Sequence, residues 1–298
     1  METAATADPL EFDDELLLAP PPRLARAGRF LLHNPLTLLG VIIVIAVLVT
    51  AIFGTILAPH NPDIPDYTAL LAPPSAAHPF GTDELGRDVL SRVLTGAKYS
   101  VFVALSVLAI GVGVGAAVGL LAGYFGGTVD EALMRLTDVF LAFPALVLAI
   151  AVASTLGAGI TTTIIALGVV WWPWYARLVR GQVLAIRELT YVEAARVIGS
   201  RAPRIMISHI LPETLAPIII QLSLDVGFAI LASSSLSFIG LGAQAPTPEW
   251  GAMISDAQTY LRDGWWMATF PGLAIMVTAL GFNLLGDGLR DFLDPRLS

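Results

Sequence analysis

The chain has 298 residues, of which 56% are hydrophobic and only 13% are charged, with a formal net charge of −8 at pH 7. With a mean hydropathy of +0.77, this composition lies outside the range of soluble globular proteins and predicts an all-α integral membrane protein. Because the sequence holds no cysteine, it excludes disulfide bonds and thiolate metal sites.

The first 35 residues are polar at their start. Five acidic residues lie between residues 8 and 15, and three consecutive prolines follow at residues 20–22. This composition is typical of a disordered, solvated chain, so residues 1–35 are predicted to form a cytoplasmic tail that is largely disordered at its start. The first apolar segment begins near residue 36 after an acidic lead. This pattern differs from a cleaved signal peptide and predicts an uncleaved first span.

Six segments are mostly apolar over roughly 20 residues, the length that a helix needs to cross about 30 Å of hydrocarbon. These predicted spans are 36–58, 99–123, 139–157, 160–179, 214–240 and 269–289. Lysine and arginine are enriched in cytoplasmic loops. With the N-terminus inside, twelve arginines fall on the cytoplasmic side, and three arginines and the single lysine fall outside. The sequence therefore predicts six transmembrane helices with both termini in the cytoplasm. Residues 290–298 form the predicted cytoplasmic C-terminus.

The first predicted external loop covers residues 59–98. Its apolar residues between 85 and 94 fall near helical spacing, and Thr82 or Asp83 could cap such a segment. This pattern predicts a short helix that lies at the membrane surface or packs on the spans.

The second predicted external loop covers residues 241–268. Trp250, Trp265 and Trp266 suit a belt of aromatic residues at the membrane interface. Anchoring and substrate delivery both remain open as roles for the two external loops, because nothing in their sequences separates the two.

The second predicted span carries a glycine repeat, "GVGVGAAVGLLAGYFGG". Glycine recurs every four residues, at Gly111, Gly115, Gly119, Gly123 and Gly127. On a helix, this spacing makes a smooth stripe that another backbone can approach closely. A dinucleotide-binding glycine loop would need a preceding strand and a following acidic residue, and the span offers neither. The repeat therefore predicts helix packing.

The fifth predicted span contains Gln221 and Asp225, four residues apart and so on one face of a helix. A charge inside the bilayer is costly and usually faces a cavity or a partner. Two interpretations stay open: the pair lines a transport pathway, or Asp225 is protonated or paired at a helix interface. Prolines are expected to kink three of the spans, at Pro144, Pro173 and Pro217.

Several catalytic and ligand-binding patterns are absent from the sequence. The four histidines are widely scattered and form no paired-histidine motif, so no metal site is predicted. A phosphate-binding loop needs Gly-Lys followed by Ser or Thr, whereas the single lysine, Lys98, lies between Ala97 and Tyr99. If ATP powers this protein, another polypeptide must hydrolyse it. No catalytic residue and no cofactor are predicted for the chain itself.

The segment "EAARVIGSRAPRIMISHILP" lies in the predicted cytoplasmic loop 187–212. It resembles the EAA loop of the membrane subunits of bacterial ABC importers, in which Glu-Ala-Ala is followed by a spaced glycine and by Leu-Pro. Six residues fit this pattern: Glu193, Ala194, Ala195, Gly199, Leu211 and Pro212. His209 occupies the position that is apolar in the general pattern, and "HILP" resembles the peptide and nickel branch of the family.

Three further segments resemble the C-type permease of dipeptide, oligopeptide and nickel importers: "FGTDELGRDVLSR" near residue 80, "PTPEWGAMISDA" near residue 246 and "FPGLAIMVTALGFNLLGDGLRDFLDPRL" at the end. The likeness runs from about residue 25 to the C-terminus. It implies a type I ABC importer permease fold over residues 99–289 and a place in the bacterial plasma (inner) membrane.

The resemblance also implies partners and a mechanism. A second, similar permease would pair with this chain in the lipid membrane, two cytoplasmic ATPase subunits with their ATP and magnesium would drive it, and an external binding protein would deliver di- or oligopeptides. No nucleic acid is expected. The EAA loop would dock on the ATPase as a coupling helix. The implied coupling residues are Glu193, Ala194, Ala195, Arg196, Gly199, Arg201, His209, Leu211 and Pro212.

The residues of the loop themselves predict a helix–turn–helix. Glu193 and Arg196, three apart, are suited to a local pair. Gly199 can supply a left-handed backbone, Ser200 could cap a second short helix, and Pro203 is tolerated in the first turn of that helix. From the residues alone, two other functions stay open: a self-sufficient ion-coupled transporter with Asp225 as its proton site, and a membrane scaffold without a pathway.

Overall fold

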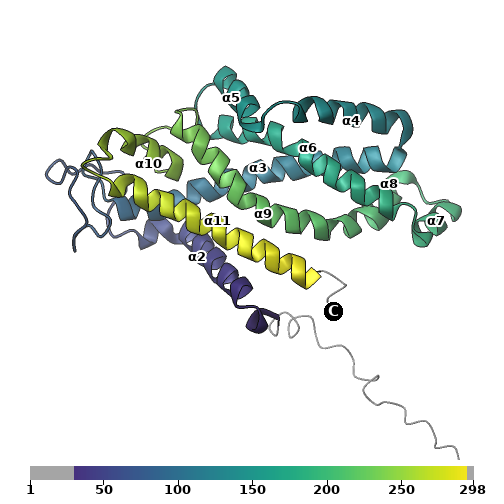
Figure 1. Ribbon diagram of the computed structural model, residues 1–298, viewed down its shortest axis with the longest axis horizontal. Coiled ribbons are helices and arrows are strands. Elements are labelled where there is room, and N and C mark those ends of the chain that lie inside the picture. Colours follow the sequence, from purple (N-terminus) through teal and green to yellow (C-terminus); the bar gives the residue numbers. More distant parts are fainter. Residues whose placement is uncertain (1–29, 294–298) are drawn as a thin grey trace, which may run out of the picture.

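The computed structural model describes residues 30–293 (Figure 1). Apart from one isolated antiparallel bridge between Thr82 and Asp88, the regular secondary structure of the described residues is helical. The helices are α2 (Pro35–Leu57), α3 (Val89–Phe125), α4 (Gly127–Leu141), α5 (Ala145–Leu156), α6 (Ile160–Ile186), α7 (Thr190–Val197), α8 (Ala202–Ile205), the π-helix η2 (Met206–Ile210), α9 (Leu211–Phe238), α10 (Trp250–Ala257), the 3-10 helix η3 (Gln258–Tyr260) and α11 (Trp266–Leu293). The acidic part of the predicted tail lies outside the described residues.

Four helical segments are long and apolar enough to cross a membrane: α2, α3, the continuous stretch Ala202–Phe238 that includes α9, and α11. The bent pair α4 and α5 would make a fifth. Helix α6, with 27 residues, is long enough to cross a membrane but is not among the sufficiently apolar segments. Three tryptophans with polar indole N–H groups lie near its centre: Trp171, Trp172 and Trp174. The all-helical membrane fold agrees with the sequence, and the count of six spans stays a prediction.

Helix α3 begins at Val89, ten residues before the predicted second span. The short surface helix predicted near residues 85–94 is therefore wrong, because most of its apolar residues form the first turns of α3. Neither Thr82 nor Asp83 caps a helix. Asp88 is the N-cap, and its carboxylate accepts a hydrogen bond from the Ser91 backbone N–H at the start of α3.

The third predicted span, 139–157, is not one straight helix. Helix α4 ends at Leu141, α5 starts at Ala145, and the two axes differ by 86°. Pro144 is the N-cap of α5, where its ring disfavours helical backbone at the preceding residue. At 1.5 Å per residue, α5 is about 18 Å long, shorter than the hydrocarbon core.

The glycine repeat of α3 lies against α6. Four of its members leave no room for a side chain next to that helix: Gly111, Gly115, Gly119 and Gly123. A Cβ atom on Gly115 would lie 2.5 Å from the carbonyl oxygen of Trp172, and one on Gly123 would lie 2.7 Å from Cβ of Val183. Gly127, the fifth glycine of the repeat, has no atom within 4 Å of a Cβ and begins α4. The close contact between α3 and α6 therefore covers four of the five glycines.

Helices α2 and α11 pack together beside this pair. Gly40 of α2 is so close to α11 that an added Cβ would lie 2.7 Å from Cβ of Leu284. The ring centroids of Phe30 and Phe292 are 5.4 Å apart, so the two ends of the described chain are neighbours. Figure 1 shows both ends on the side of the molecule toward which α7 and α8 project, opposite α10.

The three tryptophans of the second external loop differ in exposure. Trp265 is 52% exposed, as a residue at the membrane interface can be. Trp250 and Trp266 are buried, and their indole N–H groups donate to the carbonyl oxygens of Val93 and Thr82. These two side chains fasten the predicted second external loop to the start of α3 and to the predicted first external loop, because a buried indole needs a hydrogen-bond acceptor. They do not belong to an exposed aromatic belt.

Candidate functional site

A helical hairpin joins the end of α6 to the start of α9. Helix α7 ends in a Schellman motif, in which Gly199 N–H donates to the carbonyl of Arg196 and Ser200 N–H donates to that of Ala195, each at 3.0 Å. Gly199 has a φ of +83°, a left-handed backbone that glycine adopts without steric cost. The turn predicted from the sequence is therefore present at this glycine.

The second arm of the hairpin starts differently from the prediction. Arg201, not Ser200, is the N-cap of α8, and no side chain caps that helix. Pro203 lies in the first turn of α8 and Pro212 in the first turn of α9, where their missing N–H groups cost little. His209 lies in the π-helix between α8 and α9, and its carbonyl accepts a hydrogen bond from the Tyr191 hydroxyl at 3.4 Å.

The two arms of the hairpin hold together through a small apolar core. Val192 and Ala195 of α7 are buried, as are Ile205 and Ile210 of the second arm. Most of the coupling residues implied by the sequence are exposed instead: Glu193, Ala194, Arg196, Gly199, Arg201 and Pro212. Ala195 is buried, and His209 and Leu211 are half-buried. The hairpin thus has a closed interior and an outer surface that carries the EAA pattern.

Two apolar residues at the tip of the hairpin were not singled out from the sequence. Val197 is 87% exposed and Ile198 is 80% exposed. They directly precede the glycine turn, in a segment otherwise rich in charge. Two adjacent apolar residues in a charged segment were the feature of the sequence that could have pointed to an exposed contact surface. Large apolar side chains exposed at the end of a projecting hairpin suit burial against another protein.

The last turn of α7 and the end of α6 are both tied to the end of α3. The expected ion pair between Glu193 and Arg196 is absent from the described structure. Instead, the Arg196 guanidinium lies over the ring of Tyr124, 5.5 Å from its centre, which is a cation–π distance. Arg187, at the end of α6, donates to the Gly123 carbonyl at 2.8 Å. A movement of the hairpin would therefore act on α3 as well as on α6 and α9.

Two further ion pairs hold α4 to α6 near this end. Arg180 contacts Asp130 through both Nε and Nη2, at 2.5 and 2.6 Å, in the planar two-point geometry typical of Arg and a carboxylate. Arg177 pairs with Asp138 at 2.5 Å. These arginines act within the chain as anchors between helices, and they fix the position of the helix from which the hairpin leaves.

A polar cluster lies where α6 meets the middle of α9. The Asp225 carboxylate accepts hydrogen bonds from the Tyr175 hydroxyl at 2.9 Å, from the Gln221 amide at 2.9 Å and from the Trp171 indole at 3.4 Å. Tyr175 is buried, Asp225 is half-buried and Gln221 is exposed, so the cluster reaches from the packed interior to an open face of α9. With about 14 residues of helix on either side, Asp225 lies about 20 Å from each end of α9.

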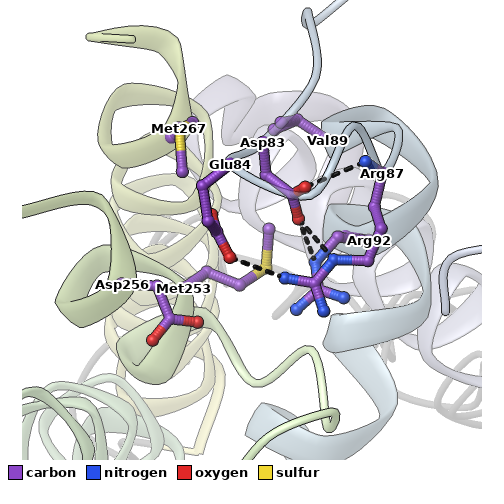
Figure 2. A pocket seen from close by; sticks show the side chains of 8 residues that line it. All are labelled: Asp83, Glu84, Arg87, Val89, Arg92, Met253, Asp256 and Met267. Carbon is purple, nitrogen blue, oxygen red and sulfur yellow. Dashed lines mark hydrogen bonds and ion pairs between the residues drawn. The ribbon is translucent and has the colours of Figure 1, made fainter. Parts of the chain in front are cut away.

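The opposite end of the molecule contains a charged pocket (Figure 2). Asp83 pairs with Arg87 at 2.7 Å and with Arg92 at 3.4 Å, and both arginines are buried. Burial raises the pKa of the carboxyl groups of Glu84 and Asp256 above their ordinary values. These pairs fix the predicted first external loop to α3 beside α10, so two of the four positive charges expected on the external side, Arg87 and Arg92, have a structural role.

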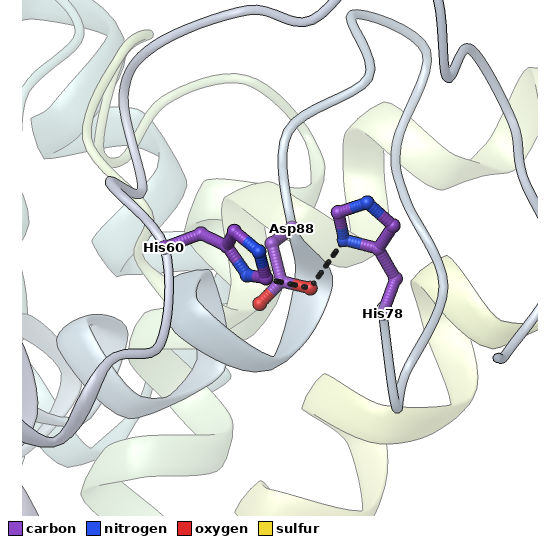
Figure 3. Close-up of side chains that lie close together, drawn as sticks. All are labelled: His60, His78 and Asp88. Carbon is purple, nitrogen blue, oxygen red and sulfur yellow. Dashed lines mark hydrogen bonds and ion pairs between the residues drawn. The ribbon is translucent and has the colours of Figure 1, made fainter. Parts of the chain in front are cut away.

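The structure also brings together two histidines that lie 18 residues apart in the sequence. His60 and His78 flank the carboxylate of Asp88 (Figure 3). This group could not be predicted from the sequence, because its members follow none of the short spacings of known metal motifs. Loop folding between α2 and α3 produces it.

Comparisons with known proteins cover most of the chain. The family described as a binding-protein-dependent transport system inner membrane component matches residues 115–298. The N-terminal TM domain of oligopeptide transport permease C matches residues 23–74. The probable D,D-dipeptide transport system permease protein DdpC of Escherichia coli K12 is 48% identical over 263 residues, 88% of each chain.

Two other relatives have similar coverage. The dipeptide transport system permease protein DppC of Alkalihalophilus pseudofirmus is 42% identical over 271 residues, which are 91% of this chain and 89% of that protein. The glutathione transport system permease protein GsiD of Pectobacterium atrosepticum is 42% identical over 270 residues, 90% of this chain and 89% of that protein. The hairpin, the Asp225 cluster and the charged pocket beside α10 all lie within the matched length.

Proposed function

The chain belongs to the family of binding-protein-dependent transport system inner membrane components, and from this premise we propose how it works in an ABC importer. It pairs with a second, homologous permease in the membrane, and the two form a pathway between them. An external binding protein delivers the substrate, and two separate ATPase subunits supply the energy. The chain itself is non-catalytic, and ATP and magnesium bind to the ATPase subunits.

The hairpin between α6 and α9 is the proposed docking element for the ATPase. Its exposed apolar tip, Val197 and Ile198, is the observation that carries this proposal. Burying two such side chains in a cleft of a soluble partner would release water from apolar surface. The internal core of the hairpin and the contact of Arg196 with Tyr124 make it stiff enough to transmit a push to the helices.

The proposed substrates are di- or oligopeptides. The relatives named above are permeases for D,D-dipeptide, dipeptide and glutathione, which are all short peptides or peptide-like molecules. Peptides carry amide and charged groups that need polar partners inside a membrane. Gln221 and Asp225, on the open face of α9 at mid-helix, are proposed to line the pathway and to offer such partners.

Cross-linking tests the docking proposal directly. Because the chain has no cysteine of its own, Ile198→Cys introduces a single thiol at the tip. In the assembled transporter, a maleimide–benzophenone reagent attached to this thiol is expected to cross-link to an ATPase subunit when it is illuminated, visible as a shifted band on a denaturing gel. Arg262→Cys, exposed on the second external loop, is the matched control and should give no such product. Equal cross-linking at both positions, or none at Ile198→Cys, would contradict docking at the tip.

Replacing Asp225 tests the pathway proposal. Asp225→Asn removes the negative charge and leaves one side-chain oxygen where two now accept from Tyr175, Gln221 and Trp171. We expect about a tenfold loss of ATP-driven peptide uptake in proteoliposomes, which corresponds to roughly 1.4 kcal/mol. Ser223→Ala, a buried position two residues away whose hydroxyl only bonds its own helix, should keep normal uptake. Normal uptake in Asp225→Asn would instead assign the cluster to helix packing.

A further inference from the structure

The group formed by His60, His78 and Asp88 has the geometry of a metal site (Figure 3). Nδ1 of His78 lies 3.0 Å from Oδ1 of Asp88, and Nδ1 of His60 lies 3.8 Å from the same oxygen. The two imidazole rings are 4.8 Å apart between centroids. One possible ligand atom from each residue lies within 4.8 Å of the others. Three side chains from separate parts of the first external loop therefore converge on one point.

The carboxylate of Asp88 is held in place before any ligand binds. Its side chain is fully buried, and Oδ2 accepts hydrogen bonds from the Ser91 backbone N–H at 2.8 Å and from the Ser91 hydroxyl at 2.7 Å. The backbone N–H of His60 donates to the same hydroxyl at 3.0 Å. These bonds leave Oδ1 directed at the two histidines. Such second-layer hydrogen bonds orient ligands in metal sites.

The backbone around His78 is also fixed. Its carbonyl accepts from the N–H groups of Ser75 at 2.8 Å and Gly81 at 2.9 Å, and its own N–H donates to the Ser75 hydroxyl at 3.1 Å. The side chains of His60 and His78 are 44% and 18% exposed. The site is therefore built on a closed turn and a helix N-cap, and it is open to solvent on the side of His60.

We propose that His60, His78 and Asp88 bind a divalent transition-metal ion of the zinc type, through the two Nδ1 atoms and Oδ1. Zinc takes nitrogen and oxygen ligands at about 2.1 Å, so neighbouring ligand atoms in a tetrahedral site are about 3.4 Å apart. The two measured distances from Oδ1, 3.0 and 3.8 Å, lie on either side of that value. A small rotation of the exposed His60 ring brings its nitrogen into range, and solvent supplies the fourth ligand.

A simple histidine–carboxylate hydrogen bond explains less of this arrangement. That bond needs only His78 and Asp88, and it is present at 3.0 Å. Nδ1 of His60 is beyond hydrogen-bond distance of Oδ1, yet it is directed toward the same oxygen. Two neutral imidazoles and one carboxylate are a common ligand set for zinc and related ions. The bound ion would tie the chain just after α2 to the N-terminus of α3 and so stabilise the first external loop.

Metal binding to the purified full-length chain in detergent tests this proposal. The affinity tag must contain no histidine. After chelator treatment and dialysis, Zn²⁺ is titrated by calorimetry, and bound metal is counted by mass spectrometry. We expect one Zn²⁺ per chain. His60→Gln and His78→Gln should each bind Zn²⁺ about tenfold or more weakly, because each removes one of three protein ligands. His33→Gln, which removes a histidine outside the group, is the matched control and should bind as the unsubstituted chain does.

A second readout separates binding at this site from loss of folding. Zn²⁺ should raise the thermal unfolding midpoint of the unsubstituted chain and of His33→Gln, since a ligand that binds only the folded state stabilises it. The midpoints of His60→Gln and His78→Gln without metal should stay close to normal, and the same concentration of Zn²⁺ should raise them less than it raises the midpoint of the unsubstituted chain. Equal Zn²⁺ affinity in all four proteins, or no binding to the folded unsubstituted chain, would overturn the proposal. Transport activity does not enter either measurement, so the result is independent of the proposed function.

Discussion

Replacing Val197 and Ile198 together by aspartate is expected to abolish almost all ATP-driven uptake while the chain remains folded. Both side chains are more than three-quarters exposed, so the substitution removes little contact within the chain. On docking, each apolar side chain contributes about 1.5–3 kcal/mol if it is fully buried. Two carboxylates at the same place would have to lose their water without a partner, which adds a further cost. We therefore expect the ATPase to bind at least about 100-fold more weakly.

The measurement compares three proteins in the same membrane preparation. The double aspartate variant should reach the membrane in normal amount but retain no ATPase subunits after detergent extraction and affinity purification. Val197→Leu with Ile198→Leu is the matched control, because it keeps an apolar tip of similar volume and should retain both the ATPase subunits and uptake. Normal uptake by the aspartate variant would show that the tip does not carry the docking, whatever the rest of the EAA segment does.

The hairpin shows how far local sequence determines structure. The turn at Gly199 could be predicted, because a left-handed residue after a short helix is a property of a few neighbouring residues. The partner of Arg196 could not, because the ring of Tyr124 comes from α3, more than 70 residues earlier. The exposure of Val197 and Ile198 had only an indirect signal in the sequence, their adjacency in a charged segment, and the packing of both arms shows that these two side chains do not face the core.

Hydropathy also could not predict where helices end or that His60, His78 and Asp88 come together. Hydropathy predicted the second span from residue 99, but α3 runs ten residues further toward its N-terminus because Asp88 caps it there. The 86° bend between α4 and α5 lies inside a segment whose composition alone is apolar enough for one span. His60 and His78 meet only after a loop has closed on itself. Composition predicts which segments are apolar, single local residues such as Asp88 and Pro144 decide where helices start and bend, and contacts distant in sequence decide where side chains such as His60 and His78 meet.

The glycine stripe is a case in which the pattern predicted the contact type but not the partner helix. A spacing of four glycines along one face implies a close approach by another helix. Helix α6 is that partner, and it brings Trp171 and Tyr175 against α3 on one side and against Asp225 on the other. The packing of α3 on α6 and the polar cluster on α9 therefore depend on the same helix position.

Gly115→Val is accordingly expected to destabilise the chain severely. A Cβ at this position would lie 2.5 Å from the Trp172 carbonyl oxygen and 2.9 Å from the Ala176 nitrogen, so it would meet backbone atoms that cannot turn aside. The two helices would have to separate along the whole stripe. Overpacking of this kind costs about 3 kcal/mol or more, which lowers the unfolding midpoint of a chain of this size by about 6–12 °C.

Gly113→Val on the same helix is the matched control. Nothing lies within 4 Å of a Cβ there, and Gly113 is exposed, so the same side chain should leave the midpoint within about 1 °C. Intrinsic tryptophan fluorescence during heating in detergent follows both variants, and Trp171 and Trp172 report from the contact itself. If α6 shifts, the 2.9 Å bond from Tyr175 to Asp225 lengthens, so uptake by any Gly115→Val that still folds should fall as well. Equal unfolding midpoints for the two variants would mean that α3 and α6 do not pack through the stripe. A loss of uptake confined to Gly115→Val would tie the backbone contact to the polar cluster across α6.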